Sequence, residues 1–376
     1  MSSSTTGGTR HRRMLSGLDR LIADGDTVAR LADRQVGLLS NHASKTAAGL
    51  PASRALDRRL REAGGTRLQL FSPEHGFELG AGAGETVGHG ADPLTGLPVV
   101  SLYGGAEDDQ GALDDIDTLV IDLRDVGVRC YTYAATAARA ARMALERHIE
   151  VIVCDRANPL GPAAEGPRPE PDRRSLLAFF DVPFIHGHTI GELLARHVAP
   201  AVHEAPFLVY PADIVLDAEL GWTPPSPALA HPDAVAAYGG LVLLEATNVS
   251  EGRGSALSFR SVSAPGLDNA ALADAINGWP TGFRARATSV TGSRAPHGGA
   301  GLPGVMLWPR KAQRQYPLML GVHLLAWLRD HYPDFDWLPG ADGTPGGAID
   351  TLFGRGDLRE ALERGEPADR ILEAWL

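Results

Sequence analysis

The chain has 376 residues, which at about 150 residues per domain suggests two domains, and its 46 acidic and 35 basic residues give a net charge of −11. An acidic protein repels polyanions, so we expect no nucleic-acid partner. No apolar run reaches the roughly 18 residues that a membrane span needs, and two cysteines are too few for a disulfide framework or a zinc site built from several thiolates.

The N-terminal residues 1–13 are rich in Ser, Thr and Gly and then basic, a composition typical of a disordered tail. Residues 14–23 carry only scattered apolar side chains at helical spacing, whereas a secretory signal requires an unbroken apolar stretch. We therefore expect a cytoplasmic protein that does not contact a membrane.

From Gln35 onward, short apolar runs alternate with helical patterns. Such alternation is typical of an α/β domain in which a mostly parallel sheet carries helices on both faces. We expect strands at 35–39, 67–72, 99–103, 118–123 and 151–155, and helices at 51–63 and 134–148.

The second half of the chain gives fewer signals. A Pro-rich passage at 203–222 indicates a connection between domains, and the apolar run at 239–247 predicts a strand that opens the second one. A strongly apolar helix is expected at 316–332 and one or two short helices at 357–376. The expected domains are 14–230 and 231–376.

Polar residues follow nearly every predicted strand of the first domain at once. In an open parallel sheet, ligands bind outside the carboxyl ends of the strands, so we expect these side chains to converge on one cleft. The alternative is that Asp and Asn simply favour turns and helix caps. The residues are Asn41, Glu74, His75, Asp122, Arg124, Asp125, Asp155, Arg156 and Asn158.

The most informative of these segments is Ser72–Phe77, which reads Ser-Pro-Glu-His-Gly-Phe. Pro73 fixes the chain as it leaves the strand and Gly76 permits a sharp turn, so that Glu74 and His75 can be held at the edge of a cleft. Glu74 is then a candidate general acid or base. The alternative is a Glu that caps a neighbouring helix, but it does not explain why Pro73 and Gly76 flank the Glu-His pair.

Other motifs are weaker. The segment Gly80–Glu85 does not have the G-x-G-x-x-G spacing of a dinucleotide site, and the chain has neither a P-loop nor a G-x-S-x-G nucleophile elbow. His186 and His188 flank a glycine and could supply two imidazoles to a metal near His75 and either Asp125 or Asp155, so a metallohydrolase is an open alternative. We expect no metal and no cofactor.

A set of motifs resembles, in order and spacing, the exo-β-N-acetylmuramidase (NamZ) family, long known as a domain of unknown function. The resemblance extends from about Gln35 to the C-terminus. The motifs are Ser72–Phe77, Thr95–Gly104, Asp122–Tyr133, Asp155–Pro159, Glu165–Pro167, His186–Glu192 and Glu245–Ser255.

The resemblance implies a Rossmann-like N-terminal domain, a smaller α/β C-terminal domain and a cofactor-free cleft between them. It further implies an enzyme that hydrolyses N-acetylmuramic acid from the non-reducing end of peptidoglycan fragments, with the family's presumed catalytic carboxylate at Glu74.

The chain departs from the family pattern at several positions. The gain of a cation and the loss of an amide change the polar contacts of a cleft, so a divergent paralogue that acts on, or only binds, a different glycoside is an open alternative. The departures are Arg124 for Gln, Cys130 for Phe, Ala157 for Pro, His188 for Met, Ala246 for Gly and Ala228 for Asn.

Cleavage of a glycoside needs an acid that protonates the leaving oxygen and a second group that acts at the sugar carbon. Glu74 is our candidate for the acid, and the candidates for the second group are Asp125, Asp155 and Glu245. An arginine fork is expected to bind the lactyl carboxylate of the sugar. The candidate substrate-binding residues are Asn41, Arg129, Tyr131, Arg156, Asn158, His186, His188, Asn248 and Arg253, with a small glycoside as the partner and the oligomeric state left open.

Overall fold

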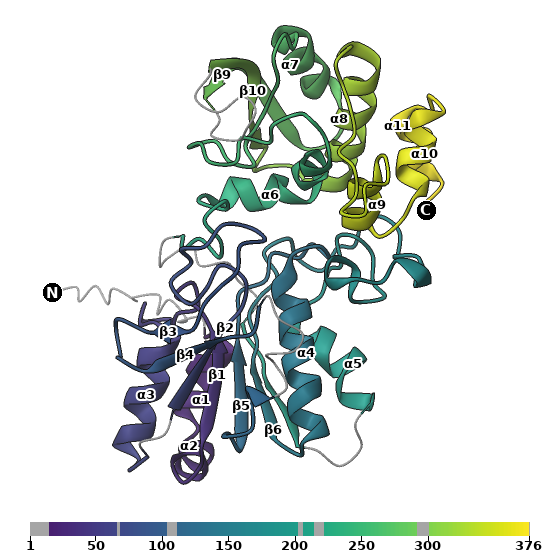
Figure 1. Cartoon of the computed structure of the whole chain (residues 1–376). Coiled ribbons are helices and arrows are strands. Elements are labelled where there is room, and N and C mark those ends of the chain that lie inside the picture. The colour runs from purple at the N-terminus through teal and green to yellow at the C-terminus, as the bar shows by residue number, and fades with distance from the viewer. Residues whose placement is uncertain are drawn as a thin grey trace, which may run out of the picture.

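The computed structural model describes residues 15–65, 68–103, 111–201, 206–213, 222–291 and 301–375. The tail expected at 1–13 lies outside this part of the chain. The described residues form a larger N-terminal domain around a seven-stranded sheet and a smaller domain around a three-stranded sheet (Figure 1). No helix among them is long and apolar enough to cross a membrane.

The larger sheet has the strand order β3-β4-β2-β1-β5-β6-β7, and every neighbouring pair is parallel except β3 with β4. Without β3, the parallel strands follow the order 3-2-1-4-5-6 of doubly wound, Rossmann-like folds, which confirms the predicted α/β class. The strands are β1 Val36–Ser40, β2 Leu68–Ser72, β3 Gly90–Ala91, β4 Pro98–Ser101, β5 Thr118–Asp122, β6 Glu150–Cys154 and β7 Phe207–Tyr210.

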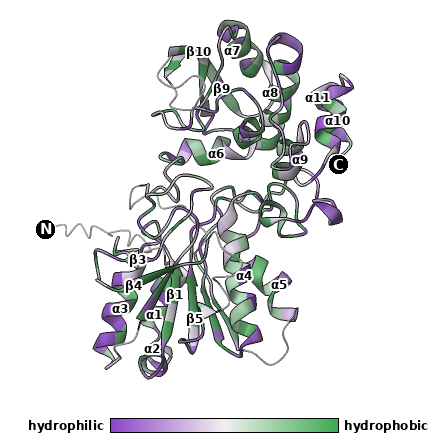
Figure 2. Ribbon diagram, in the orientation of Figure 1, coloured by the Kyte–Doolittle hydropathy of each residue, from purple (hydrophilic) through white to green (hydrophobic). Residues whose placement is uncertain are grey.

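Alternate residues of each strand pack on opposite faces of this sheet. Val36 and Leu38 of β1 pack in one core with residues of the helices α1, α2 and α3. Leu39 packs on the other face, in a second core that contains residues of the helices α4 and α5. Figure 2 shows the strands as mostly hydrophobic and α3 as largely hydrophilic on the outside. The helices are α1 Gly17–Ala23, α2 Gly25–Ala32, α3 Ala52–Glu62, α4 Thr132–Glu146 and α5 Ile190–His197.

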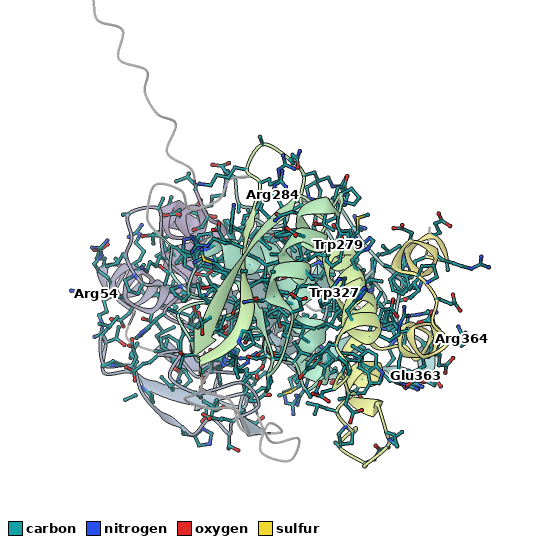
Figure 3. The ribbon with its side chains drawn as sticks, turned by 90° about the horizontal axis from the view of Figure 1, so that it is seen from above. Arg54, Trp279, Arg284, Trp327, Glu363 and Arg364 are labelled. Atoms are coloured by element: carbon teal, nitrogen blue, oxygen red, sulfur yellow. The ribbon has the colours of Figure 1, made fainter. Side chains whose placement is uncertain are left out.

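The smaller domain contains an antiparallel sheet in the order β8-β10-β9. Trp279 follows α7 and its ring stacks on His323 of α8 with centroids 5.2 Å apart, and Figure 3 shows Trp279 near Trp327 of α8. The elements are α6 Pro232–Leu241, β8 Ser261–Ser263, α7 Asn269–Gly278, β9 Phe283–Thr291, β10 Gly301–Pro309, α8 Pro317–His331, α9 Gly347–Phe353, α10 Asp357–Glu363 and α11 Ala368–Glu373.

Two predictions for the middle of the chain are wrong. The strand expected at 239–247 is the end of α6 followed by a 3₁₀ helix at Val242–Ala246. This segment is buried on nearly all sides, and such a run has no periodicity that separates a strand from a helix. The passage expected at 203–222 contains the edge strand β7, while its residues 203–205 and 214–221 lie outside the described part.

The two domains share one hydrophobic core, which runs from α4 to α6 and α8. Helices α6 and α8 approach each other at Gly240 and Gly321. A Cβ atom at Gly240 would lie 2.1 Å from the carbonyl oxygen of Pro317, and one at Gly321 would lie 2.7 Å from the Cα of Gly240. This approach therefore requires glycine at both positions.

A carboxylate of the N-terminal domain caps the first turn of α8. The N-cap residue Tyr316 offers no side-chain acceptor, and Glu165 instead accepts a hydrogen bond from the backbone N–H of Leu318 at 3.2 Å. Burial beside a cavity of about 160 Å³ outweighs this bond and raises the pKa of Glu165 to about 7.

Replacing Glu165 by Gln is expected to change how stability depends on pH. The folded pKa of about 7 exceeds the ordinary value of 4.5, so the folded state binds more protons in this window and wild-type stability falls as the pH rises through it. Glu165→Gln keeps an acceptor and has no charge to desolvate. We expect it to be more stable than wild type by about 3 kcal/mol at pH 8 but not at pH 4. Thermal melts across this range test the prediction, and parallel curves for the two proteins would contradict it.

Candidate functional site

A cavity of about 690 Å³ opens where the carboxyl ends of the parallel strands face the smaller domain. Segments that follow β2, β4 and β5 line one side, and α6, the 3₁₀ helix after it and the loop beyond line the other. This is the edge at which doubly wound folds bind their ligands. The lining residues used below are Glu74, His75, Glu85, Tyr103, Cys130, Tyr131, Thr132, Tyr238, Glu245, Arg253 and Phe259.

Glu74 is fixed in this cavity by donors from two segments. It follows β2 and is 7% exposed. Its Oε1 accepts a hydrogen bond from the backbone N–H of Gly84 at 2.8 Å, and its Oε2 accepts one from the hydroxyl of Thr132. Thr132 is the first residue of α4, so the carboxylate lies at the positive end of a 15-residue helix.

Tyr103 is a third neighbour of Glu74. Its side chain lines the cavity at the end of the segment that follows β4. Burial, together with the charge of Glu74 and a hydrogen bond to it, raises the pKa of Tyr103 to about 12. The phenol therefore stays protonated at neutral pH and can donate to the carboxylate.

Two cavity residues other than glycine have a left-handed backbone, His75 at φ 70° and Phe259 at φ 51°. Such conformations are costly for these residue types and cluster at functional sites. His75 is held in place because its Nδ1 lies 2.9 Å from the carbonyl oxygen of Ala81. The turn predicted around Gly76 thus places Glu74 and His75 side by side at the cavity.

Arg253 lies on the opposite wall with two carboxylates. It contacts Glu245 directly, and its Nε lies 3.3 Å from Glu251. Burial opposes the charge, but these carboxylates outweigh it and raise the pKa of Arg253. The guanidinium also lies over the ring of Phe259, 5.1 Å from its centroid, and 24% of its side chain remains exposed.

Aromatic side chains form a further part of the cavity wall. The ring of Tyr131 contacts that of Tyr238 edge to face at 5.9 Å, and Tyr238 contacts Phe259 in the same way at 4.8 Å. Burial raises the pKa of the Cys130 thiol beside them to about 12. Tyr131 and Tyr238 line the cavity with 5% and 7% of their surface exposed, so this part of the wall is mostly apolar, and the neutral thiol adds no charge.

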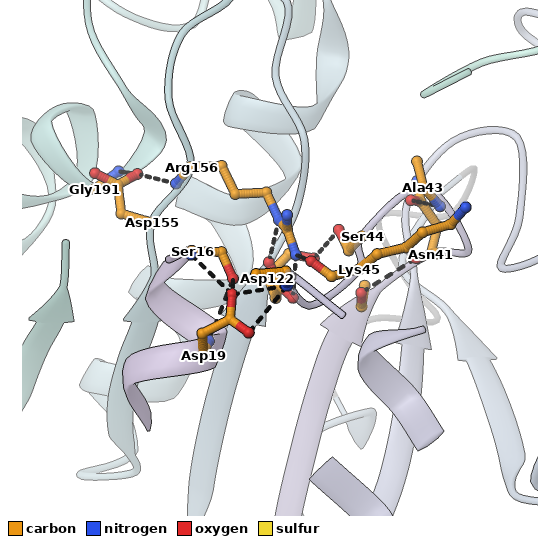
Figure 4. A network of polar contacts seen from close by, with 12 residues as sticks. Ser16, Asp19, Asn41, Ala43, Ser44, Lys45, Asp122, Asp155, Arg156 and Gly191 are labelled. Atoms are coloured by element: carbon orange, nitrogen blue, oxygen red, sulfur yellow. Dashed lines mark hydrogen bonds and ion pairs between the residues drawn. The ribbon is translucent and has the colours of Figure 1, made fainter. Parts of the chain in front are cut away.

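Asp155 and Arg156 have partners within the protein, away from the cavity lining. Arg156 forms a two-point ion pair with Asp122, with Nη2 and Oδ2 2.9 Å apart, and its Nη2 also donates to the carbonyl of Lys45 (Figure 4). Asp155 accepts a hydrogen bond from Thr189 at 2.6 Å and one from the N–H of Gly191 at 2.9 Å. It therefore caps the start of α5, and burial raises its pKa.

Asp125 and His186 form a second buried pair. The Nε2 of His186 lies 3.1 Å from Oδ2 of Asp125, and its Nδ1 accepts a hydrogen bond from the backbone N–H of His188 at 3.1 Å. Burial and the charge of Arg196 lower the pKa of His188. Among the residues that the structure describes, no three His, Cys, Asp or Glu side chains form a group that could hold a metal ion.

Arg129 connects two loops and the end of α9. Its guanidinium donates to the carbonyls of Pro167 at 3.0 Å, Val182 at 2.8 Å and Phe353, and burial lowers its pKa to about 10. It therefore joins the C-terminal domain, which contains Phe353, to the N-terminal one.

The side chains of the three predicted asparagines also form hydrogen bonds with backbone groups of the protein. Asn41 accepts from the N–H of Ala43, Asn158 donates to the carbonyl of His188, and Asn248 accepts from the N–H of Asp336. Of the predicted residues, those that line the cavity are Glu74, His75, Tyr131, Glu245 and Arg253. Those placed elsewhere are Asn41, Asp125, Arg129, Asp155, Arg156, Asn158, His186, His188 and Asn248.

The sequence does not single out several polar residues of the cavity, among them Tyr103, Thr132, Glu85 and Tyr238. Tyr103 and Thr132 stand inside quoted motifs, but a hydroxyl alone gives no signal of its role. Glu85 ends the glycine-rich segment, whose spacing excludes a dinucleotide site but gives no signal for a catalytic carboxylate. Tyr238 lies in an apolar helix and was indistinguishable from a core residue.

Comparison with known proteins gives matches along nearly the whole chain. The family model of the exo-beta-N-acetylmuramidase NamZ N-terminal part matches residues 36–233, and that of its C-terminal part matches residues 236–376. The peptidoglycan beta-N-acetylmuramidase NamZ of Bacillus subtilis (strain 168) is 31% identical over 373 residues, which cover 96% of this chain and 87% of the relative.

Two crystal structures of DUF1343 family proteins from Bacteroides fragilis have the same fold. The first has a TM-score of 0.78 and 25% identity, and the match covers 97% of this chain and 98% of the other. The second has a TM-score of 0.68 and 24% identity over 96% of this chain and 94% of the other, a likeness of fold alone.

Proposed function

The chain belongs to the exo-β-N-acetylmuramidase NamZ family of glycoside hydrolases, and from that membership we propose that it removes N-acetylmuramic acid, or a related amino sugar, from the non-reducing end of peptidoglycan-derived fragments. The reaction takes place in the 690 Å³ cavity between the domains, with Glu74 as the general acid. The observation that carries this proposal is a buried carboxyl group held by Gly84 and Thr132 at the wall of the cavity.

The size and lining of the cavity support a sugar as the ligand. Small-molecule sites commonly have volumes of about 300–1,000 Å³ and combine apolar walls with a few placed polar groups. Here Tyr131 and Tyr238 supply the flat apolar surface, while Glu74 and Arg253 supply polar groups. A pyranose ring has the matching pattern, because its C–H faces are apolar and its hydroxyl edges are polar.

Glu74 can hold the proton that the leaving oxygen needs. The hydroxyls of Thr132 and Tyr103 can accept a hydrogen bond as well as donate one, so a protonated carboxyl keeps its partners. The backbone N–H of Gly84 meanwhile holds the other oxygen. The group is thus positioned in both protonation states, as acid catalysis of glycoside cleavage requires.

Glu74→Gln is expected to abolish hydrolysis without unfolding the protein. Gln keeps the volume and an acceptor for Gly84 but cannot give up a proton, so the rate should fall by about 10²–10⁴-fold. The measurement is release of chromophore from a chromogenic N-acetylmuramide and from a panel of other glycosides. Glu78→Gln is the control, because Glu78 is exposed on the same segment and does not line the cavity. Activity of Glu74→Gln within threefold of wild type would contradict the assignment, and binding without turnover by wild type would indicate a sugar-binding paralogue.

Arg253 is proposed to bind the lactyl carboxylate of the sugar. Arg253→Lys keeps a positive charge beside the fully buried Glu251 but loses the two-point fork. A charge-assisted hydrogen bond contributes about 1.5–3 kcal/mol, so KM for an N-acetylmuramide should rise about tenfold or more, and KM for the N-acetylglucosamine analogue should change little.

The matched control for this experiment is Arg129→Lys. Arg129 donates to three backbone carbonyls, so its replacement should lower Tm and affect both substrates alike. If Arg253→Lys behaves in the same way, Arg253 has a structural role and does not recognise the acid.

A further inference from the structure

The glycine-rich segment Gly80–Glu85 folds back onto the two residues that the Pro-Glu-His-Gly turn presents. The backbone N–H of Ala81 donates to the carbonyl of His75 at 3.2 Å, and the carbonyl of Ala81 lies 2.9 Å from Nδ1 of His75. The N–H of Gly84 donates to Glu74 at 2.8 Å. This segment is therefore a part of the cavity wall, and Glu85 is the residue next to the amide that holds Glu74.

We propose that Glu85 is the second carboxylate of the reaction and works together with Glu74. This inference rests on the proposed function and names a residue that sequence reasoning did not consider for the role. Glu85 and Glu74 line the same cavity, and the contact between Gly84 and Glu74 brings the two segments together.

The side chain of Glu85 has a defined position. Its Oε2 accepts a hydrogen bond from the backbone N–H of Gly82 at 2.7 Å, and its own N–H donates to the carbonyl of Gly82 at 3.3 Å. A Cβ atom at Gly82 would lie 2.9 Å from Oε1 of Glu85. Glycine at position 82 thus lets the carboxylate fold over the turn, and a larger residue would displace it.

The other candidates for the second role are less suitable. Asp125 and Asp155 do not appear in the lining of the cavity as the described residues define it, and each holds other groups of the protein. Glu245 lines the cavity but contacts Arg253. Glu85 forms no ion pair within the described part of the chain.

The two carboxyl groups have different environments, as acid and base roles require. Glu74 is buried among hydroxyls, whereas Glu85 is exposed. Glu74 gives its proton to the glycosidic oxygen as the bond from that oxygen to the sugar carbon breaks. Water adds its oxygen to the same carbon, and Glu85 faces the positive charge there and takes the proton that water loses. That proton returns to Glu74 through solvent, so the sum is glycoside plus water giving sugar plus alcohol.

The test compares Glu85→Gln with Glu74→Gln and Glu245→Gln in the full chain, on a chromogenic N-acetylmuramide or whichever glycoside of the panel the wild type cleaves. We expect Glu85→Gln to lower kcat by about 10²-fold or more with KM within a few fold of wild type. It should also remove the acidic limb of the pH profile of kcat/KM, because that limb reports the group that must be ionised. Glu78→Gln is again the control and should stay within twofold of wild type.

Two further variants distinguish the loss of a catalytic carboxylate from a general disturbance of the fold. Azide should restore turnover to Glu85→Ala, since a small anion can replace the lost carboxylate, and it should not stimulate Glu78→Ala. Gly82→Ala should lower kcat while Glu85 itself is intact, because the added methyl group displaces that carboxylate.

Glu85→Gln with activity within threefold of wild type, or with an unchanged acidic limb, would overturn the assignment. If Glu74→Gln is inactive in the same experiment, the proposed function survives that result. A wild-type protein that cleaves no glycoside of the panel would overturn both.

Discussion

The contact between Thr132 and Glu74 is the interaction on which the arrangement of the cavity depends. Glu74 follows β2 and Thr132 begins α4 after β5, and β1 lies between these two strands in the sheet. Because all three strands are parallel, their carboxyl ends meet at one edge, and the carboxylate reaches the start of the helix. Thr132 is the first residue of α4, so Glu74 is held at the start of this helix. The strand order therefore holds Glu74 at the cavity even when no substrate is bound.

Most of the other polar residues at this edge stabilise the fold. Asp122 pairs with Arg156, Asp155 caps α5, and Asp125 pairs with His186. Charged groups that are buried need partners, since desolvation of an isolated charge costs several kcal/mol. These pairs fix the loops around the cavity, so that the residues that face it can be held in strained conformations such as the left-handed backbone of His75.

The sequence predicts the sheet of the N-terminal domain well because its strands are short apolar runs separated by helices with clear periodicity. It also singles out Glu74 and His75, since the flanking Pro73 and Gly76 indicate a fixed turn. It cannot separate Glu74 from Asp155, because both follow strands, and only the packing shows that one faces a cavity and the other a helix end. The error at 239–247 has a similar cause, as a segment that is buried on nearly all sides, with Glu245 and Thr247 only near its end, carries too few polar residues to reveal its period. The position of Arg253 beside Glu245 depends on tertiary contacts that no local pattern encodes.

The central claim is that a glycoside is cleaved in this cavity with its bridging oxygen at Glu74. The most direct test is a crystal structure of the inactive Glu74→Gln variant with the disaccharide of N-acetylmuramic acid and N-acetylglucosamine bound. We expect the sugar at the non-reducing end to lie against the wall formed by Tyr131 and Tyr238. We also expect the glycosidic oxygen to lie within hydrogen-bond distance of the side chain at position 74. A disaccharide bound at another place on the protein, or bound here with that oxygen turned away from position 74, would contradict it.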